Sequence, residues 1–210
     1  MLIFKELIYN GVRSGEIPAR TKSSREWYRE TARQSFSEIQ PGESSDKFRP
    51  GNVVKQFSEK RRVSRPELGM MYSFKYDPKH KKTLPYYDTF PLIFPVEQYN
   101  DGILGINFHY LPLAGRAKLM DALYTVSSDK RYNERTKILA TYDILRGASK
   151  FSGFRPTLKR YLYEYVKTPF LEITAAEWDI ALFLPMERFK KAQASEVWAD
   201  ATKKSKRKGR

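Results

Sequence analysis

Residues 70–96 read MMYSFKYDPKHKKTLPYYDTFPLIFPV, and GILGINFHYL follows at residues 102–111. The first seven letters alternate well enough to predict a strand, and Asp77-Pro78 is typical of a turn. TFPLIFPV and GILGINFHYL each predict another strand, with a hairpin turn at Asp101-Gly102 between them. Proline is tolerated at strand margins and sheet edges. The three strands therefore predict a small, strongly bent antiparallel sheet or partial barrel at about residues 68–112.

Helical patterns follow this region. Asn133 can cap one helix, and a capping box at residues 174–177 (TAAE) precedes a short helix that reaches Pro185. Apolar residues at helical spacing predict longer helices at residues 113–126, 134–151, 157–167 and 187–201. The expected fold class is α+β and mostly helical.

Composition divides the chain into three parts. Residues 1–52 predict an N-terminal helical arm that ends in a linker, because residues 40–52 combine Pro, Gly, Ser and Asp. Residues 53–202 form the expected main α+β domain. Residues 203–210 (KKSKRKGR) contain no apolar side chain, which predicts a disordered basic tail. No apolar run approaches the roughly 20 residues of a membrane span, so no membrane partner is expected.

The net charge of +15 is concentrated rather than spread, because residues 53–95 and 203–210 carry 11 of the 15 net charges. Such clusters favour binding to a phosphate-rich polymer or to an acidic protein surface. The alternative is a solvated face and a soluble tail without a binding role.

The basic clusters and one tyrosine pair are the candidate nucleic-acid-binding residues. Lysine and arginine bind phosphates without reading sequence, and exposed tyrosines stack on bases for about 1–3 kcal/mol per base. Tyr86 and Tyr87 are adjacent, so a regular strand would leave one of them exposed, whereas Phe90 and Phe94 are expected in the core. The candidates are Lys60, Arg61, Arg62, Lys79, Lys81, Lys82, Tyr86, Tyr87, Arg155, Lys159, Arg160, Lys203, Lys204, Lys206, Arg207 and Lys208.

Catalytic motifs are scarce in this sequence. The absence of Cys excludes thiolate nucleophiles and zinc–thiolate sites. The two histidines, His80 and His109, do not have a metal-binding spacing, and His109 is expected to be packed or hydrogen-bonded on its strand. A metal-dependent nuclease using Asp77, Asp88 or Glu97 is an alternative, although the two aspartates are also typical turn residues. We expect no enzymatic activity, no cofactor and no metal.

YDPKHKKTLPYYDTFPLIFPV, the strand GILGINFHYL, TKILATYDILRGASKF and EITAAEWDIALFLPMERFKKA resemble the DNA end protector proteins of large contractile-tailed bacteriophages. The resemblance spans roughly residues 66–195. It implies a virion protein of the head or head–tail connector, assembled in the host cytoplasm. Such a protein binds the end of packaged linear double-stranded DNA without sequence specificity and protects it from host exonuclease on injection.

The resemblance also implies DNA termini and phage head, portal or neck proteins as partners, and a role in head completion. No functional residue transfers with it, so the candidate residues rest on their chemistry alone. The alternative function is a purely structural component of the virion neck or baseplate with no direct DNA role.

Overall fold

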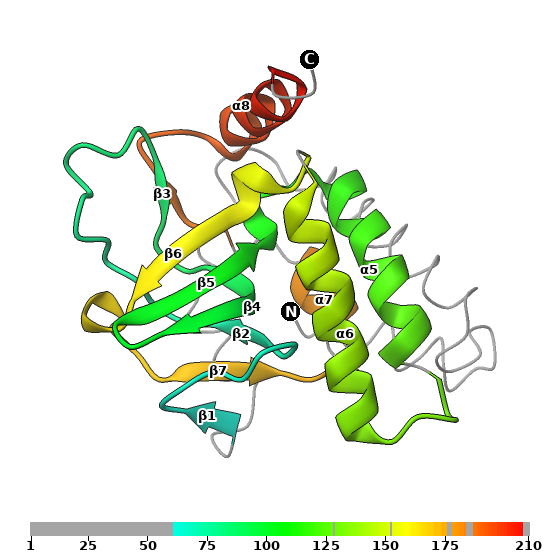
Figure 1. The fold of residues 1–210 in the computed structure, drawn as a ribbon. Helices are drawn as coiled ribbons and strands as arrows, with labels where there is room; N and C mark the ends of the chain where they lie inside the picture. The colour runs from blue at the N-terminus through cyan, green and yellow to red at the C-terminus, as the bar shows by residue number, and fades with distance from the viewer. Residues whose placement is uncertain (1–60, 128, 152, 176–177, 184–186, 208–210) are drawn as a thin grey trace, which may run out of the picture. The chain divides into compact units, whose positions relative to one another are not determined.

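The computed structural model describes residues 61–127, 129–151, 153–175, 178–183 and 187–207 (Figure 1). The chain forms two compact units, one of residues 57–178 and 187–210 and one of residues 1–56 and 179–186. Of the smaller unit, only residues 179–183, which belong to helix α7 (Trp178–Phe183), are described. The predicted arm and linker at residues 1–52 lie outside the described residues, and the predicted division into domains stays a prediction.

A six-stranded sheet forms the framework of the larger unit, with antiparallel neighbours in the order β1-β7-β2-β4-β5-β6. A second, two-stranded sheet pairs β3 with β8. The strands are β1 (Arg62–Val63), β2 (Met71–Ser73), β3 (Tyr87–Asp88), β4 (Leu92–Tyr99), β5 (Gly102–Asn107), β6 (Leu158–Leu162), β7 (Phe170–Ile173) and β8 (Phe189–Lys190).

The β4–β5 hairpin confirms the predicted turn, since Tyr99 pairs with Gly102. Glycine is required at position 102 because β6 approaches its backbone closely. A Cβ atom there would lie 2.1 Å from the carbonyl oxygen of Tyr161. This close approach sets β6 against β5 as an edge strand of the larger sheet.

The prediction of a mostly helical chain with a small sheet at residues 68–112 is wrong. The sheet has six strands and recruits β6 and β7 from the C-terminal half of the chain. Residues 157–167, predicted as a helix, form β6 between two 3-10 turns, η3 (Arg155–Thr157) and η4 (Tyr163–Tyr165). The open edge of β5 accounts for this difference, because backbone pairing such as Ile106 with Leu158 overrides a weak helix propensity.

Helices α5 (Leu113–Ser127) and α6 (Glu134–Lys150) confirm two predicted helices and pack side by side next to the sheet (Figure 1). The predicted cap is also confirmed, since Asn133 Oδ1 accepts a hydrogen bond of 2.8 Å from the backbone N–H of Thr136. In the larger unit, the N-terminal residue of α7, Trp178, donates through Nε1 to the Ile173 carbonyl. No described helix is long and apolar enough to cross a membrane.

The last helix, α8 (Ala194–Arg207), differs from its prediction at both ends. It begins later than expected because residues 189–190 pair with β3. It also contains residues 203–207, so the prediction of a disordered tail is wrong there, while residues 208–210 lie outside the described part. Val197 and Ala201 are buried and anchor the helix. Once these turns are formed, each further residue that joins the helix adds one backbone hydrogen bond, and the helix can therefore extend through residues 203–207.

Aromatic side chains fill one face of the larger sheet. The buried cluster comprises Tyr72, Phe74, Tyr76, Ile93, Ile103, Tyr161 and Phe170. Phe74 and Tyr161 meet edge to face with ring centroids 5.3 Å apart, a favourable geometry for aromatic pairs. Tyr76 and Tyr161 extend this core toward the loop between β2 and β3.

Candidate nucleic-acid interface

Residues 77–86 lie in the connection between β2 and β3 and carry Lys79, His80, Lys81 and Lys82; we call them the basic loop. Its first residue is held beside η4, since the Asp77 N–H donates to the Tyr165 carbonyl at 3.1 Å. Lys81 Nζ lies 2.9 Å from each carboxylate oxygen of Asp77. The loop therefore projects beside the end of β6.

Lys191 ties the other half of the basic loop to the segment between β8 and α8. Its backbone φ is 70°, which is uncommon for a residue with a side chain. Its Nζ donates to the carbonyl oxygens of Lys82 and Leu84, both at 2.9 Å. These bonds hold the loop in one conformation while Lys79 and Lys82 remain exposed.

Tyr86 joins the end of the basic loop to α8. Its hydroxyl donates to Asp200, which also accepts from Lys204 Nζ at 2.6 Å. Hydrogen bonds from Lys204 and Tyr86 hold the pKa of Asp200 below its usual value. Burial is the main cause that raises the pKa of Tyr86, and its bond to Asp200 acts in the same direction. The Tyr86 ring thus stays neutral at physiological pH, 6.0 Å from the ring of Tyr110.

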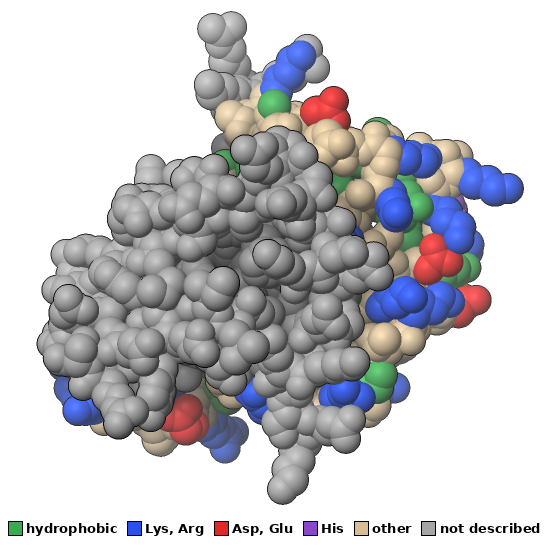
Figure 2. Space-filling view, turned by 180° about the vertical axis from the view of Figure 1, so that it is seen from behind, with side chains coloured by type: hydrophobic (Ala, Val, Ile, Leu, Met, Phe, Trp, Pro, Cys, Tyr) green, Lys and Arg blue, Asp and Glu red, His purple; other side chains and the backbone are tan. Residues whose placement is uncertain are grey.

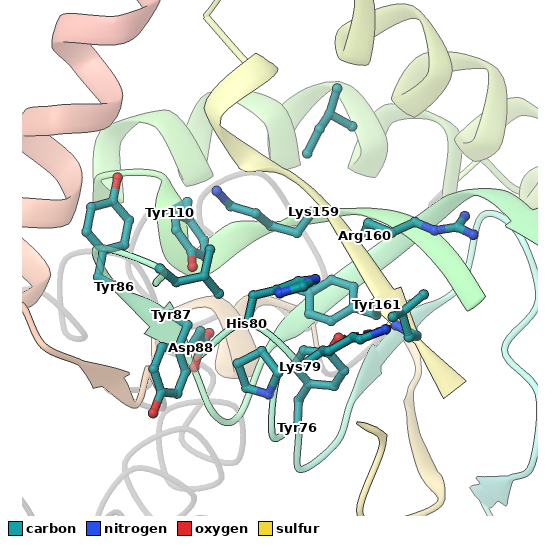
Figure 3. Close-up of a pocket in the computed structure, with 14 residues that line it drawn as sticks. Tyr76, Lys79, His80, Tyr86, Tyr87, Asp88, Tyr110, Lys159, Arg160 and Tyr161 are labelled. Carbon is teal, nitrogen blue, oxygen red and sulfur yellow. Dashed lines mark hydrogen bonds between the residues drawn. The ribbon is translucent and has the colours of Figure 1, made fainter. Parts of the chain in front are cut away.

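Lys159 on β6 is a half-buried cation. Its Nζ lies 4.0 Å from the centroid of the Tyr110 ring. Burial lowers its pKa to about 8, the nearby charge of Lys204 acts in the same direction, and Asp200 opposes them. Its neighbour Arg160 points away from it (Figure 3) and pairs with Asp101.

A cavity of about 420 Å³ lies between the basic loop, β3 and β6 (Figure 3). Basic side chains and tyrosine rings dominate its walls, and the buried Tyr110 and Tyr161 belong to them. The basic lining residues are Lys79, His80, Lys159 and Arg160, and the tyrosines are Tyr76, Tyr86, Tyr87, Tyr110 and Tyr161. Such a lining suits an anionic ligand that carries an aromatic group.

A buried hydrogen-bond network supports the cavity at Asp88. Its carboxylate lies 2.6 Å from His109 Nδ1 and 3.2 Å from Asn107 Nδ2, and it accepts from the Phe90 and Arg188 N–H groups. Burial raises the pKa of Asp88, but the charge of His109 and these hydrogen bonds outweigh it and leave the pKa below its usual value. Asp88 therefore orders β3. His109 is packed and hydrogen-bonded as expected, but it lies in the 3-10 turn η2 (Phe108–Tyr110) that follows β5 and not on the predicted strand.

The nuclease alternative needs carboxylates that converge on a metal ion. Asp77 bonds to Lys81, Asp88 is buried in its network, and Glu97 is exposed on β4. In the described part of the chain, no group of three or more His, Asp and Glu side chains is placed to hold a metal.

The structure brings together several of the candidate residues and separates others. Five of them line the cavity: Lys79, Tyr86, Tyr87, Lys159 and Arg160. Lys81 and Lys82 lie in the basic loop outside the cavity wall. Arg155 lies on η3, which contacts α8, and Lys203 and Lys204 lie on α8. Arg62 lies on β1, at the opposite edge of the sheet from β6, and Arg61 precedes it. Lys206 and Arg207 end α8, and Lys60 and Lys208 lie outside the described residues.

Some expectations about side chains need correction or addition. Tyr86 and Tyr87 are both half-buried, so the expected contrast between a buried and an exposed ring is wrong; Tyr86 precedes β3 instead of lying on a regular strand. Phe90 and Phe94 are buried as predicted. Sequence reasoning missed Tyr110, Lys191 and Asp200, although the four-residue spacing of Asp200 and Lys204 is a recognisable ion-pair signal.

Basic side chains gather on the side of the larger unit that carries the basic loop. Figure 2, which views the molecule from behind, shows several Lys and Arg side chains close together there, with fewer acidic ones between them. A surface of this kind attracts polyphosphate without specifying its sequence.

The family model of the phage T4 terminal DNA protecting protein matches residues 25–201. The chain belongs to this family. The assignment confirms the resemblance to DNA end protectors of contractile-tailed phages, and the matched residues include the basic loop, the cavity and most of α8. Comparisons with curated proteins and with solved structures gave no match.

Proposed function

We propose that this protein binds the end of linear double-stranded DNA without reading its sequence and shields that end from exonuclease. The supporting observation is the meeting of basic segments that are distant in sequence at one tyrosine-lined cavity. The basic loop and β6 line the cavity, and Lys204 of α8 lies 5.7 Å from the ring of Tyr86, which belongs to its wall. The family membership supports the same function, because the family is described by its protection of terminal DNA.

Phosphate contacts supply the affinity in this proposal. Lys79 and Lys82 are exposed, and neither has an acidic partner within 4.0 Å among the described residues. Each can therefore neutralise a backbone phosphate and release counterions, which adds affinity independent of sequence. Protection then needs only coverage of the terminus, because an exonuclease must load there before it cuts.

In the phage, we propose that the protein acts in the virion head or head–tail connector, on packaged DNA. Its neighbours there would be head, portal or neck proteins, and its role would include head completion. The need to reach a DNA end before injection supports these placements, together with the description of the family as protecting terminal DNA. Electron microscopy of labelled protein in intact particles tests them.

A comparison of linear and closed-circular DNA tests the central proposal. Fluorescently labelled linear duplex is bound to the protein, and unlabelled competitors are then added as linear or relaxed closed-circular forms of one plasmid at equal mass. Competition by linear DNA should grow as the plasmid is cut into more pieces, because the number of ends rises at constant mass. Equal competition by the closed circle would contradict end binding, and no binding of either form would favour a purely structural role in the virion.

Protection itself is measured by digesting the linear duplex with a processive exonuclease in the presence of the protein. We expect the full-length DNA to persist in proportion to the occupancy of its ends. An internal endonuclease site far from both ends should be cut at the unprotected rate, since the proposed shield is local.

A further inference from the structure

Lys159 is a cation without a visible counter-ion. Its side chain is half-buried, and no carboxylate lies within 4.0 Å of its Nζ among the described residues. Asp200 on α8, whose charge acts on Lys159, is already bonded to Lys204 and Tyr86. Partial burial of an ammonium group is costly unless an anion pairs with it, so this position suits an anionic ligand.

The surroundings of Lys159 indicate the form of that anion. Its Nζ points toward Tyr110 and Tyr86 (Figure 3). The walls continue from there to Tyr87 and to the buried Tyr161, so tyrosine side chains line the cavity beside Lys159. A volume of about 420 Å³ lies within the usual range for small-molecule pockets, about 300–1,000 Å³.

We propose that this cavity holds the terminal phosphomonoester of a DNA strand, with Lys159 as its phosphate-binding cation and the tyrosine rings beside the terminal nucleotide. This inference rests on the proposed function and identifies what distinguishes an end from the rest of the duplex. A phosphomonoester carries about −1.5 to −2 charges at pH 7, compared with −1 for an internal phosphodiester. A terminal phosphate is attached to nucleotide on one side only, so the cavity has to accommodate a single strand segment. An internal phosphate would bring strand segments on both of its sides.

The charges around Lys159 favour a dianion. Lys79 adds a positive charge to the cavity wall from the basic loop, where His80 also lines the cavity, and the charge of Lys204 on α8 acts on Lys159. The opposing carboxylates are Asp88 on β3 and Asp200 on α8, and both are engaged in the hydrogen bonds described above. The tyrosines Tyr86 and Tyr110 stay neutral because burial raises the pKa of each.

Duplexes with one closed end test the proposal. A DNA hairpin of about 30 base pairs leaves a single open end, which is prepared with a 5′-phosphate, a 3′-phosphate or hydroxyls only. We expect at least one phosphorylated form to bind about tenfold or more tightly than the hydroxyl form, because a charge-assisted contact contributes about 1.5–3 kcal/mol. The preferred form shows whether the phosphate comes from the 5′ or the 3′ terminus.

Three variants test whether the cavity causes the preference for a phosphorylated end over a hydroxyl end. Lys159→Gln should bind both forms equally, Lys159→Arg should keep the preference, and Lys130→Gln should behave as the wild type. Lys130 is exposed in the connection between α5 and α6 and lines no part of the cavity. Lys130→Gln therefore removes one positive charge, as Lys159→Gln does, at a position outside the cavity. Thermal unfolding by circular dichroism shows that each variant is folded.

The dependence on pH is a second readout. In the protein without ligand, Lys159 has a pKa of about 8. Above that pH its amine is mostly neutral, so the amine must take up a proton when a phosphate binds. The preference for the phosphorylated end should therefore fall by up to tenfold per pH unit above pH 8 in the wild type. It should stay constant in Lys159→Arg, because arginine remains protonated.

The outcomes separate this inference from the proposed function. If all three hairpins bind equally while linear DNA still outcompetes closed circles, the terminal-phosphate site is wrong and end binding stands. A phosphate preference that persists in Lys159→Gln also overturns the site. If closed circles compete as well as linear DNA, the proposed function itself fails.

Discussion

Lys79 and Lys82 should account for a measurable share of the salt dependence of DNA binding, whereas Lys81 should not. The first two are exposed without an acidic partner in the described part of the chain. Lys81 contacts both oxygens of Asp77 at 2.9 Å, so this pair is neutral as a unit. The perturbation is the double variant Lys79→Ala/Lys82→Ala, and its matched control is Lys81→Ala/Asp77→Ala, which removes a pair without changing the net charge.

The expected magnitude follows from counterion release. Each phosphate contact contributes about 0.9 to the slope of log K against log salt, so two lost contacts flatten the slope by roughly 1.8. Between 50 and 200 mM salt, a fourfold change, the affinity ratio of wild type to double variant should then fall about twelvefold. The control should keep the wild-type slope.

Fluorescence anisotropy with a short linear duplex, repeated at five salt concentrations, measures both slopes. Circular dichroism verifies that each double variant retains the fold, which is expected because all four side chains are partly or fully exposed. Parallel slopes for wild type and Lys79→Ala/Lys82→Ala would refute the assignment of the basic loop to DNA. A flattened slope in the control would refute the argument that Asp77 neutralises Lys81.

Three further predictions concern stability. Asp88→Asn should lower the free energy of unfolding by roughly 1.5–3 kcal/mol, because it replaces one acceptor oxygen of a buried, hydrogen-bonded carboxylate with an amide group. The folded-state pKa of Asp88 lies below its unfolded value of about 3.9, so wild-type stability should fall as pH drops from about 4 through that lower pKa, and urea unfolding should show a weaker acid dependence in the variant. Gly102→Ala should cost roughly 2–3 kcal/mol, since its Cβ would meet the Tyr161 carbonyl at 2.1 Å; thermal unfolding measures this, and an unchanged midpoint would contradict the close packing of β6. Trp198→Phe should cost about 1–2 kcal/mol by losing the 2.8 Å bond from Nε1 to the His109 carbonyl, and hydrogen exchange should be faster across α8 than in α6.

Local signals in the sequence predicted several elements correctly. Alternation located β2 and β4, the Asp101-Gly102 pair located the hairpin, and the Asn133 cap located the start of α6. These features involve residues close together in the chain, whose backbone preferences are largely independent of the remaining fold. The basic segments were equally visible, because composition does not depend on tertiary structure.

The segment at residues 157–167 marks where local reasoning failed. Leu158, Tyr161 and Leu162 follow a helical repeat, yet they lie on β6. Their conformation depends on the unpaired edge of β5, some fifty residues earlier in the chain, and no short window contains that information. The start of α8 failed for the same reason, since Phe189 and Lys190 pair with β3.

By itself, the sequence determined that the chain has strands around residues 71–107, capped helices after them, and clustered charge suited to polyphosphate. Only the tertiary structure decided which clusters meet: the basic loop, β6 and α8 converge, while Arg62 lies at the other edge of the sheet. It also decided that Lys159 is half-buried and has a lowered pKa. Burial and long-range pairing depend on which surfaces are left open after the local elements form, and this is why neither property is visible in the order of residues alone.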